Sequence, residues 1–264
     1  GMSSSAAIEC AFGTAMNELF SGGLSQEEIA LIGQQAEHQF VGVLCGIMDQ
    51  FASMFGKANH VVKIDCRSQV REYYPAEFGD YQVVLIDSKV KHELVESEYN
   101  IRREQCEKGV AIMQKNNPQI RALRDASLRD LMDVEHDMDP KVFDRCKYVI
   151  EENERVLEAC KALSANNVEQ VGELMNATHA GLSNLYEVSC DELNLLAGLA
   201  QKEDGVIGSR MMGGGFGGCT INLMKRIDVD DVTSRILWIF KKETGIDAEV
   251  YKLNIADGAR LLEN

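Results

Sequence analysis

Four segments of the sequence contain residue types that could bind a ligand or take part in catalysis. The first is the opening stretch GMSSSAA, where Ser3, Ser4 and Ser5 precede an apolar run. The first turn of a helix has unpaired backbone N–H groups and a partial positive charge, so it can hold a phosphate, and a serine there can reach a magnesium ion. The same hydroxyls can instead cap their own helix, which is the more common use of so short a motif.

The second segment, AEHQFVGVLCGIMDQF, carries two carboxylates of interest. Asp49 stands among apolar neighbours, where a buried carboxylate is costly without a partner, so we expect either a structural hydrogen bond or a chemical role for it. Gly42 and Gly46 suggest a backbone that passes close to another group, such as a ligand. Glu37 lies about three helical turns before Asp49 and, taken alone, is typical of a solvated helix face.

The third and fourth segments are a glycine-rich stretch and a tyrosine followed by arginines. SRMMGGGFGGCTINL places five glycines around Phe216, and two would be enough for a tight turn between strands. A loop whose backbone lies against a ligand therefore explains the glycine content better than a plain turn. ESEYNIRREQC contains Tyr99, whose hydroxyl can anchor a sugar, but the segment with Arg102 and Arg103 is more typical of a helix start with a solvated basic side.

Composition limits the class of protein. The 264 residues, 45% hydrophobic and 26% charged, indicate a globular protein of one large domain or two modest ones. The net charge of −15 and the absence of a basic run argue against binding to nucleic acid. The eight cysteines lack zinc-site spacing and are interpreted as buried thiols of a reducing compartment. With no secretory signal and no long apolar run, we expect a cytoplasmic location and no membrane partner.

Hydrophobic periodicity predicts the elements that position these segments. The spacing of Ile8, Phe12 and Leu19 predicts a helix that ends at residues 21–23, and a second helix begins near Ser25. Residues 59–90 contain three short stretches typical of strands, and the end of the chain predicts strand, glycine turn, strand, helix and strand. Residues 96–198 are predicted to be helical. One long segment there has an apolar side formed by Val142, Cys146, Val149, Ile150, Val156, Leu157 and Cys160.

Taken together, these segments closely resemble the galactokinase family of the GHMP small-molecule kinases. The resemblance is carried, in this order, by GMSSSA, CGIMDQF, SEYNIRREQC, YEVSCDELN and SRMMGGGFGGC, and it extends from the first residue to the last predicted strand. It implies an α+β fold. Residues 1–90 would form the remainder of an N-terminal domain, and residues 91–264 a C-terminal domain of helices against an antiparallel sheet.

The resemblance implies a phosphate and metal site at the start of the chain. Gly1, Ser3, Ser4 and Ser5 correspond to the phosphate-binding loop of the family, with Ser4 or Ser5 near Mg²⁺. Glu37 corresponds to the acidic ligand of the same ion.

The sugar site and the second loop follow from the same resemblance. Asp49 corresponds to the catalytic carboxylate that faces the C1 hydroxyl of the sugar, Gly46 to a backbone contact with the sugar, and Tyr99 to a sugar-contacting tyrosine. The glycine loop beside phosphate and substrate corresponds to Gly213, Gly214 and Gly215. Met212 stands where the family commonly has threonine, which leaves that side-chain contact open.

The implied activity is ATP-dependent phosphorylation of galactose at its C1 hydroxyl, with ATP and Mg²⁺ as the required ligands. The family also has an N-terminal signature, an arginine beside the phosphoryl group and a Glu-His-x-Asp sequence, which has no counterpart here. We therefore expect that roughly the first third of such a protein is missing and that this chain alone has little or no kinase activity. A glycine before Met2 is also typical of a residue left after removal of an expression tag.

Two alternative functions remain open at the level of the sequence. One is a regulatory protein that binds sugar and ATP without turnover, and the other is a kinase for a related sugar, such as an N-acetylated galactose or arabinose. We also expect the first helix, whose apolar side would lack its usual neighbours, to cause marginal stability, dimerisation or swapping.

Overall fold

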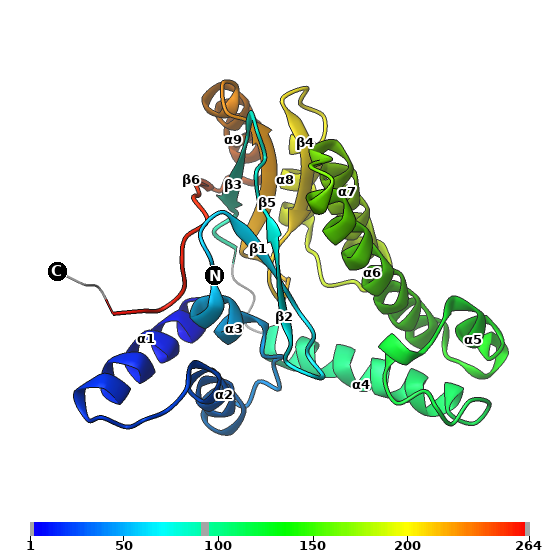
Figure 1. Cartoon of the computed structure of the whole chain (residues 1–264). Helices are drawn as coiled ribbons and strands as arrows, with labels where there is room; N and C mark the ends of the chain where they lie inside the picture. Colours follow the sequence, from blue (N-terminus) through cyan, green and yellow to red (C-terminus); the bar gives the residue numbers. More distant parts are fainter. Residues whose placement is uncertain (1–2, 91–94, 262–264) are drawn as a thin grey trace. The chain divides into compact units, whose positions relative to one another are not determined.

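The structure, a computed structural model, describes residues 3–90 and 95–261, and it divides the chain into two units (Figure 1). Unit 1 comprises residues 1–79 and 253–264, and unit 2 comprises residues 80–252. The domain division expected at residue 90 stays a prediction. Gly1 lies outside the described residues.

Unit 1 contains three packed helices and a β-hairpin. The capping box between Ser25 and Glu28 fixes the start of the second helix, as the sequence predicted. Cys10, Ile29 and Phe51, one from each helix, lie at the centre of the core. A single π-helical turn and a third helix follow the second one, and the sequence analysis predicted neither. The elements are α1 (Ser4–Leu19), α2 (Gln26–Ala36), η1 (Glu37–Val41), α3 (Met48–Phe55), β1 (His60–Ile64) and β2 (Arg71–Pro75).

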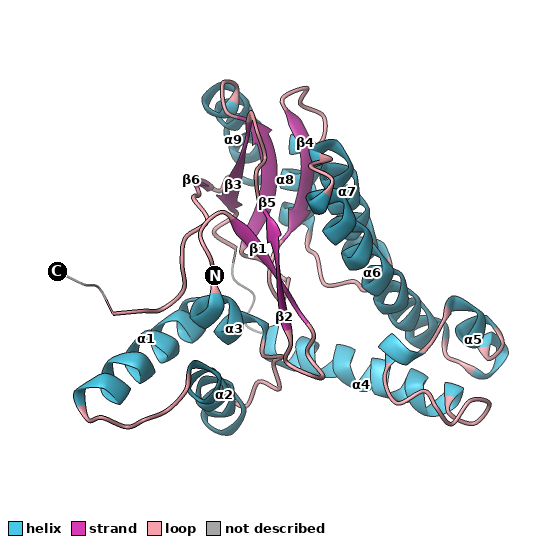
Figure 2. Cartoon of the chain, viewed as in Figure 1, coloured by secondary structure: helices cyan, strands magenta, loops and turns pink. Residues whose placement is uncertain are grey.

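Unit 2 contains a four-stranded antiparallel sheet and most of the helices (Figure 2). The strand order is β4-β5-β3-β6, so the third predicted strand pairs with strands more than 130 residues later in the chain. The elements are β3 (Tyr81–Asp87), α4 (Val95–Met113), η2 (Leu123–Asp125), α5 (Leu128–Met132), η3 (Glu135–Asp137), α6 (Pro140–Ser164), α7 (Val168–Asn184), α8 (Asp191–Ala200), β4 (Val206–Met211), β5 (Cys219–Lys225), α9 (Val229–Thr244) and β6 (Glu249–Lys252).

Helices cover the sheet of unit 2 through an apolar core. Ile86 of β3, Leu196 of α8 and Phe240 of α9 belong to one buried cluster, so α8 and α9 pack on the sheet together. The backbone of α7 lies directly against β4, because a β-carbon added to Gly172 would lie 2.3 Å from the carbonyl oxygen of Ile207. The α+β class is therefore confirmed, with the antiparallel sheet expected for the second part of the chain.

Two expectations about burial are wrong in part. Val156 and Leu157 of α6 are 44% and 49% exposed, because a periodic pattern predicts the apolar side of a helix but not the length over which a neighbour covers it. None of the eight cysteines forms a disulfide, and Cys66, in the turn between β1 and β2, is exposed. In the part of the chain that the structure describes, no helix is long and apolar enough to cross a membrane.

Candidate functional site

The serine run lies at the N-terminus of α1, and the Ser3 side chain at the N-cap position does not cap the helix. Ser3 occupies the N-cap position in a left-handed conformation, with φ of 50°, and its side chain makes no cap hydrogen bond among the described residues. Ser4 and Ser5 are exposed as well. The N-capping interpretation is therefore wrong for Ser3. Because the first N–H groups of a helix have no partner within it, this end of α1 suits an anion.

Two carboxylates meet between α1 and η1. Glu37 is only 8% exposed, and its carboxylate lies close enough to that of Glu9 for the two to interact electrostatically. Burial and the charge of Glu37 raise the pKa of Glu9, although a hydrogen bond of 3.3 Å from Gln50 acts in the opposite direction. The expectation of a solvated face is wrong for Glu37. It follows Gly33 by four residues, and Gly33 lies on the side of α2 that faces Glu9.

Asp49 lies in the first turn of α3, where the partial positive charge of the helix end favours a carboxylate. It is half-buried, and Leu44 and Met48 are 42% and 56% exposed, so the expected enclosure by apolar side chains is wrong. Burial, followed by the charges of Glu37 and Asp49, raises the pKa of Cys45. The two predicted carboxylates therefore lie within electrostatic range of one sulfur atom.

The loop before α3 is held by α2 and η1. The side chains of Gln34 and His38 both contact the carbonyl oxygen of Cys45, at 3.0 and 2.9 Å. Gly42 ends η1 with φ of 84°, so the turn itself explains that glycine. A β-carbon added to Gly46 would meet no described atom within 4 Å. Internal packing therefore does not require a glycine at position 46, and a ligand can approach the backbone there.

The glycine loop, residues 212–218 between β4 and β5, has a packed half and an open half. A β-carbon added to Gly215 would lie 2.0 Å from the carbonyl oxygen of Val188, and one added to Gly217 would lie 2.4 Å from that of Val90. The expectation that a ligand explains the glycine content is wrong for these two positions. A β-carbon on Gly213 or Gly214 would meet no described atom within 4 Å, so this half is accessible.

Tyr99 and the arginines after it lie on α4. Tyr99 is half-buried, and Arg103 is exposed as expected. The expectation of a solvated basic side is wrong for Arg102, which is 8% exposed. Its guanidinium donates to the backbone carbonyls of Tyr186 and Glu187, and such carbonyls beyond the end of a helix need donors.

The predicted site residues are distributed over both units. Unit 1 carries Ser3, Ser4, Ser5, Glu37, Gly46 and Asp49, and unit 2 carries Tyr99, Gly213, Gly214 and Gly215. Glu9 is not among the residues predicted from the sequence. The one feature that points to it is its position four residues after Ser5, which puts both residues on one face of α1.

The described residues of unit 1 include oxygen donors of the type that magnesium takes, without an assembled group of metal ligands. Within the described residues, no group of three or more His, Cys, Asp or Glu side chains is placed to hold a metal ion. However, Mg²⁺ typically takes one or two carboxylates and fills its other positions with water and phosphate oxygens. The Glu9–Glu37 pair and the hydroxyls of Ser4 and Ser5 are oxygen donors of that kind.

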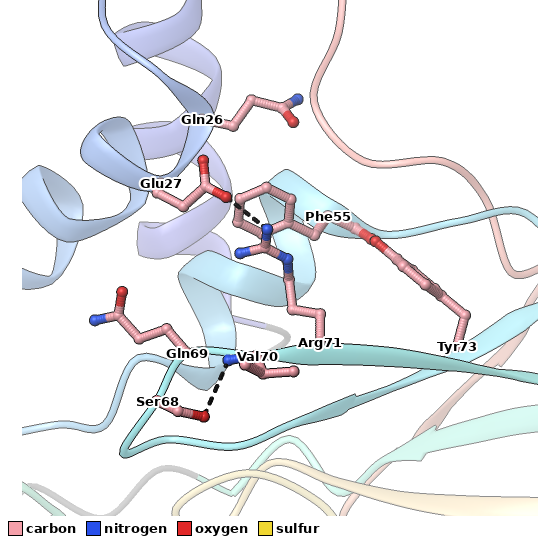
Figure 3. Close-up of a pocket in the computed structure, with 8 residues that line it drawn as sticks. All are labelled: Gln26, Glu27, Phe55, Ser68, Gln69, Val70, Arg71 and Tyr73. Carbon is pink, nitrogen blue, oxygen red and sulfur yellow. Dashed lines mark hydrogen bonds and ion pairs between the residues drawn. The ribbon is translucent and has the colours of Figure 1, made fainter.

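A separate hollow in unit 1 lies between the start of α2, the end of α3 and β2 (Figure 3). The guanidinium of Arg71, which lines this hollow, is already paired. Its Nη2 lies 2.5 Å from the carboxylate of Glu27, and its Cζ lies 3.8 Å from the ring centroid of Phe55. None of the predicted site residues lines it. The lining residues are Gln26, Glu27, Phe55, Ser68, Gln69, Val70, Arg71 and Tyr73.

Comparison with known proteins first shows the class of protein to which this chain belongs. Residues 1–57 match the model of the GHMP kinase N-terminal domain, and residues 159–236 match that of the GHMP kinase C-terminal domain. The crystal structure of Leishmania major mevalonate kinase in complex with R-mevalonate superposes with a TM-score of 0.61 at 20% identity, over 98% of this chain and 67% of that one. The fold is that of the GHMP kinases.

More similar proteins define the family. The galactokinase of Thermosipho africanus is 40% identical over 258 residues, which are 98% of this chain and 71% of that protein. The galactokinase of Lacticaseibacillus paracasei is 38% identical, over 99% and 68%. The crystal structure of Lactococcus lactis galactokinase complexed with galactose has a TM-score of 0.93 at 34% identity, over 98% and 66%. This chain belongs to the galactokinase family, as predicted, and spans between 66% and 71% of the length of these relatives.

Proposed function

We propose that this chain carries the ATP- and galactose-binding residues of a galactokinase, which transfers the γ-phosphoryl group of ATP to the C1 hydroxyl of galactose. Membership of a kinase family and the similarity to a galactose-bound galactokinase support the reaction class. Phosphoryl transfer asks a protein mainly to align the two substrates and to neutralise charge. The residues of unit 1 and of the glycine loop suit those two tasks.

In this proposal, unit 1 binds the phosphates. Ser3 and the backbone N–H groups at the start of α1 approach the phosphate oxygens, and Gly1, for which the sequence predicts the same role, lies outside the described residues. Glu37, with Ser4 or Ser5, holds Mg²⁺, which when bound neutralises charge on the phosphates. Glu9 lies near Glu37 and adds a second negative charge there.

Asp49 accepts the proton of the C1 hydroxyl or orients that oxygen toward the phosphoryl group. The backbone at Gly46 and the side chain of Tyr99 contact the sugar. Gly213 and Gly214, in the accessible half of the glycine loop, lie beside the phosphate and the substrate, and Gly215 holds the loop against Val188. The observation that supports the proposal is the position of two carboxylates, Glu37 at 8% exposure in η1 and Asp49 half-buried in the first turn of α3, in the same unit as the N-terminus of α1, where Ser3 makes no side-chain cap hydrogen bond.

The test compares this chain with a chimera that adds the part of the Thermosipho africanus galactokinase that this chain does not match. We expect the chimera to form galactose 1-phosphate from galactose and ATP, and the chain alone to form little or none. Asp49→Asn should lower kcat of the chimera by about 10²–10⁴-fold, as is typical for loss of a general base. Asp231→Asn, which removes an exposed first-turn carboxylate from α9, is the matched control.

Each other result contradicts a particular part of the proposal. An unchanged kcat in the Asp49→Asn chimera would remove Asp49 from the chemistry. Tight binding of galactose and ATP without product would favour a regulatory protein, and faster turnover of N-acetylgalactosamine or arabinose would favour a kinase for a related sugar. Normal kinase rates from the chain alone would contradict its expected inactivity.

A further inference from the structure

Two buried arginines of unit 2 converge on the segment that joins α7 to α8. Arg102 of α4 is 8% exposed and Arg145 of α6 is 1% exposed. Both donate to backbone carbonyls in residues 185–187. A buried charge is rare unless it is paired or hydrogen-bonded, so this convergence on one short segment calls for an explanation.

Arg102 uses its guanidinium as a fork with three partners. Its Nε donates to the carbonyl oxygen of Tyr186 at 2.8 Å, and its Nη2 donates to that of Glu187 at 2.7 Å. Its Nη1 donates to the carboxylate of Glu98 at 3.0 Å, one turn earlier on α4. A planar group with donors in fixed directions holds two successive carbonyls in one geometry, which a lysine cannot do.

Arg145 fixes the same segment from α6. It donates to the carbonyl oxygen of Leu185, and its Nη2 lies 2.5 Å from the carboxylate of Glu187. Glu187 has a left-handed backbone, with φ of 50°. Such a conformation is strained in a residue with a β-carbon and persists only where neighbours enforce it. The two arginines provide that enforcement.

The segment held in this way supports the packed half of the glycine loop. The N–H of Phe216 donates to the carbonyl oxygen of Val188 at 2.7 Å, directly after Glu187. Gly215 approaches the same carbonyl so closely that a β-carbon would not fit. The guanidinium of Arg102 also lies 5.8 Å from the centroid of the Phe216 ring, within the range of a cation–π contact.

The far end of the loop has its own anchor, so the two ends can be separated by experiment. The hydroxyl of Ser88 donates to the carbonyl oxygen of Gly218 at 2.7 Å, and the N–H of Gly218 donates to that of Val90 at 3.2 Å. At the β4 end, the N–H of Met212 donates to the carbonyl oxygen of Cys219 at 3.0 Å. Between Met212 and Phe216, a β-carbon on Gly213 or Gly214 would meet no described atom within 4 Å. The geometry of this open half therefore depends on Met212 at one side and on where Val188 holds Phe216 at the other.

We propose that Arg102 is a positioning residue: through the carbonyls of Tyr186 and Glu187 it fixes Val188, and through Val188 it fixes the glycine loop. The consequence for catalysis rests on the proposed function, because only there does the loop contact phosphate. The structural part of the proposal does not depend on it. Arg102 touches no reacting group in this scheme and acts only through the loop.

Hydrogen exchange of the whole chain, followed by mass spectrometry, tests the structural part. In Arg102→Gln the backbone carbonyls of Tyr186 and Glu187 lose their charged donors, so we expect the amide of Phe216 to exchange at least about tenfold faster. Amides of β3, such as that of Leu85, should keep their protection, which separates a local effect from global destabilisation. Arg103→Gln is the matched control, because Arg103 is exposed and pairs with Glu107 at 3.0 Å on the surface of the same helix.

Arg102→Lys covers the case in which Arg102→Gln does not fold. It keeps the charge but cannot serve both carbonyls, so exchange at Phe216 should rise by several-fold, less than in Arg102→Gln. If Phe216 keeps its protection in a folded Arg102 variant, or if β3 loses protection to the same extent, the proposal is overturned.

Kinetic measurements link the positioning role of Arg102 to function and distinguish the two proposals. In the active chimera, Arg102→Gln should raise KM for ATP by about tenfold or more and leave KM for galactose nearly unchanged. If the chimera shows no kinase activity but the exchange result holds, the proposed function fails and the positioning role of Arg102 stands. If the chimera is active and KM for ATP does not move, the loop does not act through Arg102.

Discussion

At the scale of single residues, Arg145 carries a charge that is almost fully buried, and Glu187 neutralises it. The Glu187 side chain is 45% exposed, so the ion pair of Arg145 and Glu187 extends from the interior to the solvent. The hydrogen bond and the charge of Arg145, with a smaller contribution from Lys141, hold the pKa of Glu187 below its ordinary value of 4.5. Such a carboxylate stabilises the fold above that value, and its contribution is lost as pH falls through its pKa in the folded state.

We therefore expect the free energy of unfolding of Glu187→Gln to change less with pH in the acidic range than that of the wild type. Urea unfolding at pH 7 should show a loss of roughly 1 kcal/mol, because partial exposure of the carboxyl screens the pair. Below about pH 4.5 the wild type should lose stability more steeply than the variant, so the two curves converge. Glu107→Gln, which removes an exposed partner of Arg103, should change little at either pH. Parallel curves for wild type and Glu187→Gln would contradict the prediction.

At the scale of elements, the glycine loop separates glycines that the fold needs from one that it does not. Gly215 combines φ of 90° with a backbone carbonyl at the place of a β-carbon. Gly214 is outside the left-handed region and has open space around it. Substitution by alanine therefore tests packing at Gly215 and ligand approach at Gly214.

Gly215→Ala should destabilise the protein by about 2–3 kcal/mol, because both the conformation and the contact with Val188 oppose a side chain. Gly214→Ala should stay within about 0.5 kcal/mol of the wild type in urea unfolding. In the active chimera, however, Gly214→Ala should raise KM for ATP, because its methyl group would occupy space that the proposal gives to phosphate. Equal stabilities of the two variants would show that Val188 does not confine the loop.

At the scale of the whole molecule, large exposed apolar side chains are concentrated in unit 1, the smaller unit. On α1, Ile8, Phe12 and Leu19 are 69%, 65% and 76% exposed, while Cys10 on another side of the same helix is fully buried. A helix that is apolar on more than one side is normally covered on each. Self-association through this exposed apolar side stays a prediction.

We expect the chain to self-associate at micromolar concentrations, measured by light scattering after size exclusion. Ile8→Ser with Phe12→Ser should weaken the association by about tenfold or more, because each side chain buries substantial apolar area in a contact. Ile227→Ser is the control, since Ile227 is 89% exposed but lies in unit 2. A wild-type chain that remains a dilute monomer and melts in one sharp transition would contradict this expectation.

The sequence by itself determined what depends on local order along the chain. Helical spacing after the serines, the capping box at Ser25 and the β-rich stretches of residues 59–90 each act within a few residues, so α1, α2 and three strands follow from pattern alone. The family follows in the same way, because its motifs are short stretches in a fixed order.

Tertiary structure decided which side chains are buried and which polar groups meet. The burial of Glu37 depends on α1, its pairing with Glu9 spans 28 positions, and the burial of Arg102 depends on carbonyls more than 80 positions away. The need for glycine at 215 likewise comes from Val188. Desolvation and hydrogen bonding act between neighbours in space, and a pattern read along the chain contains no record of which distant segment will be that neighbour.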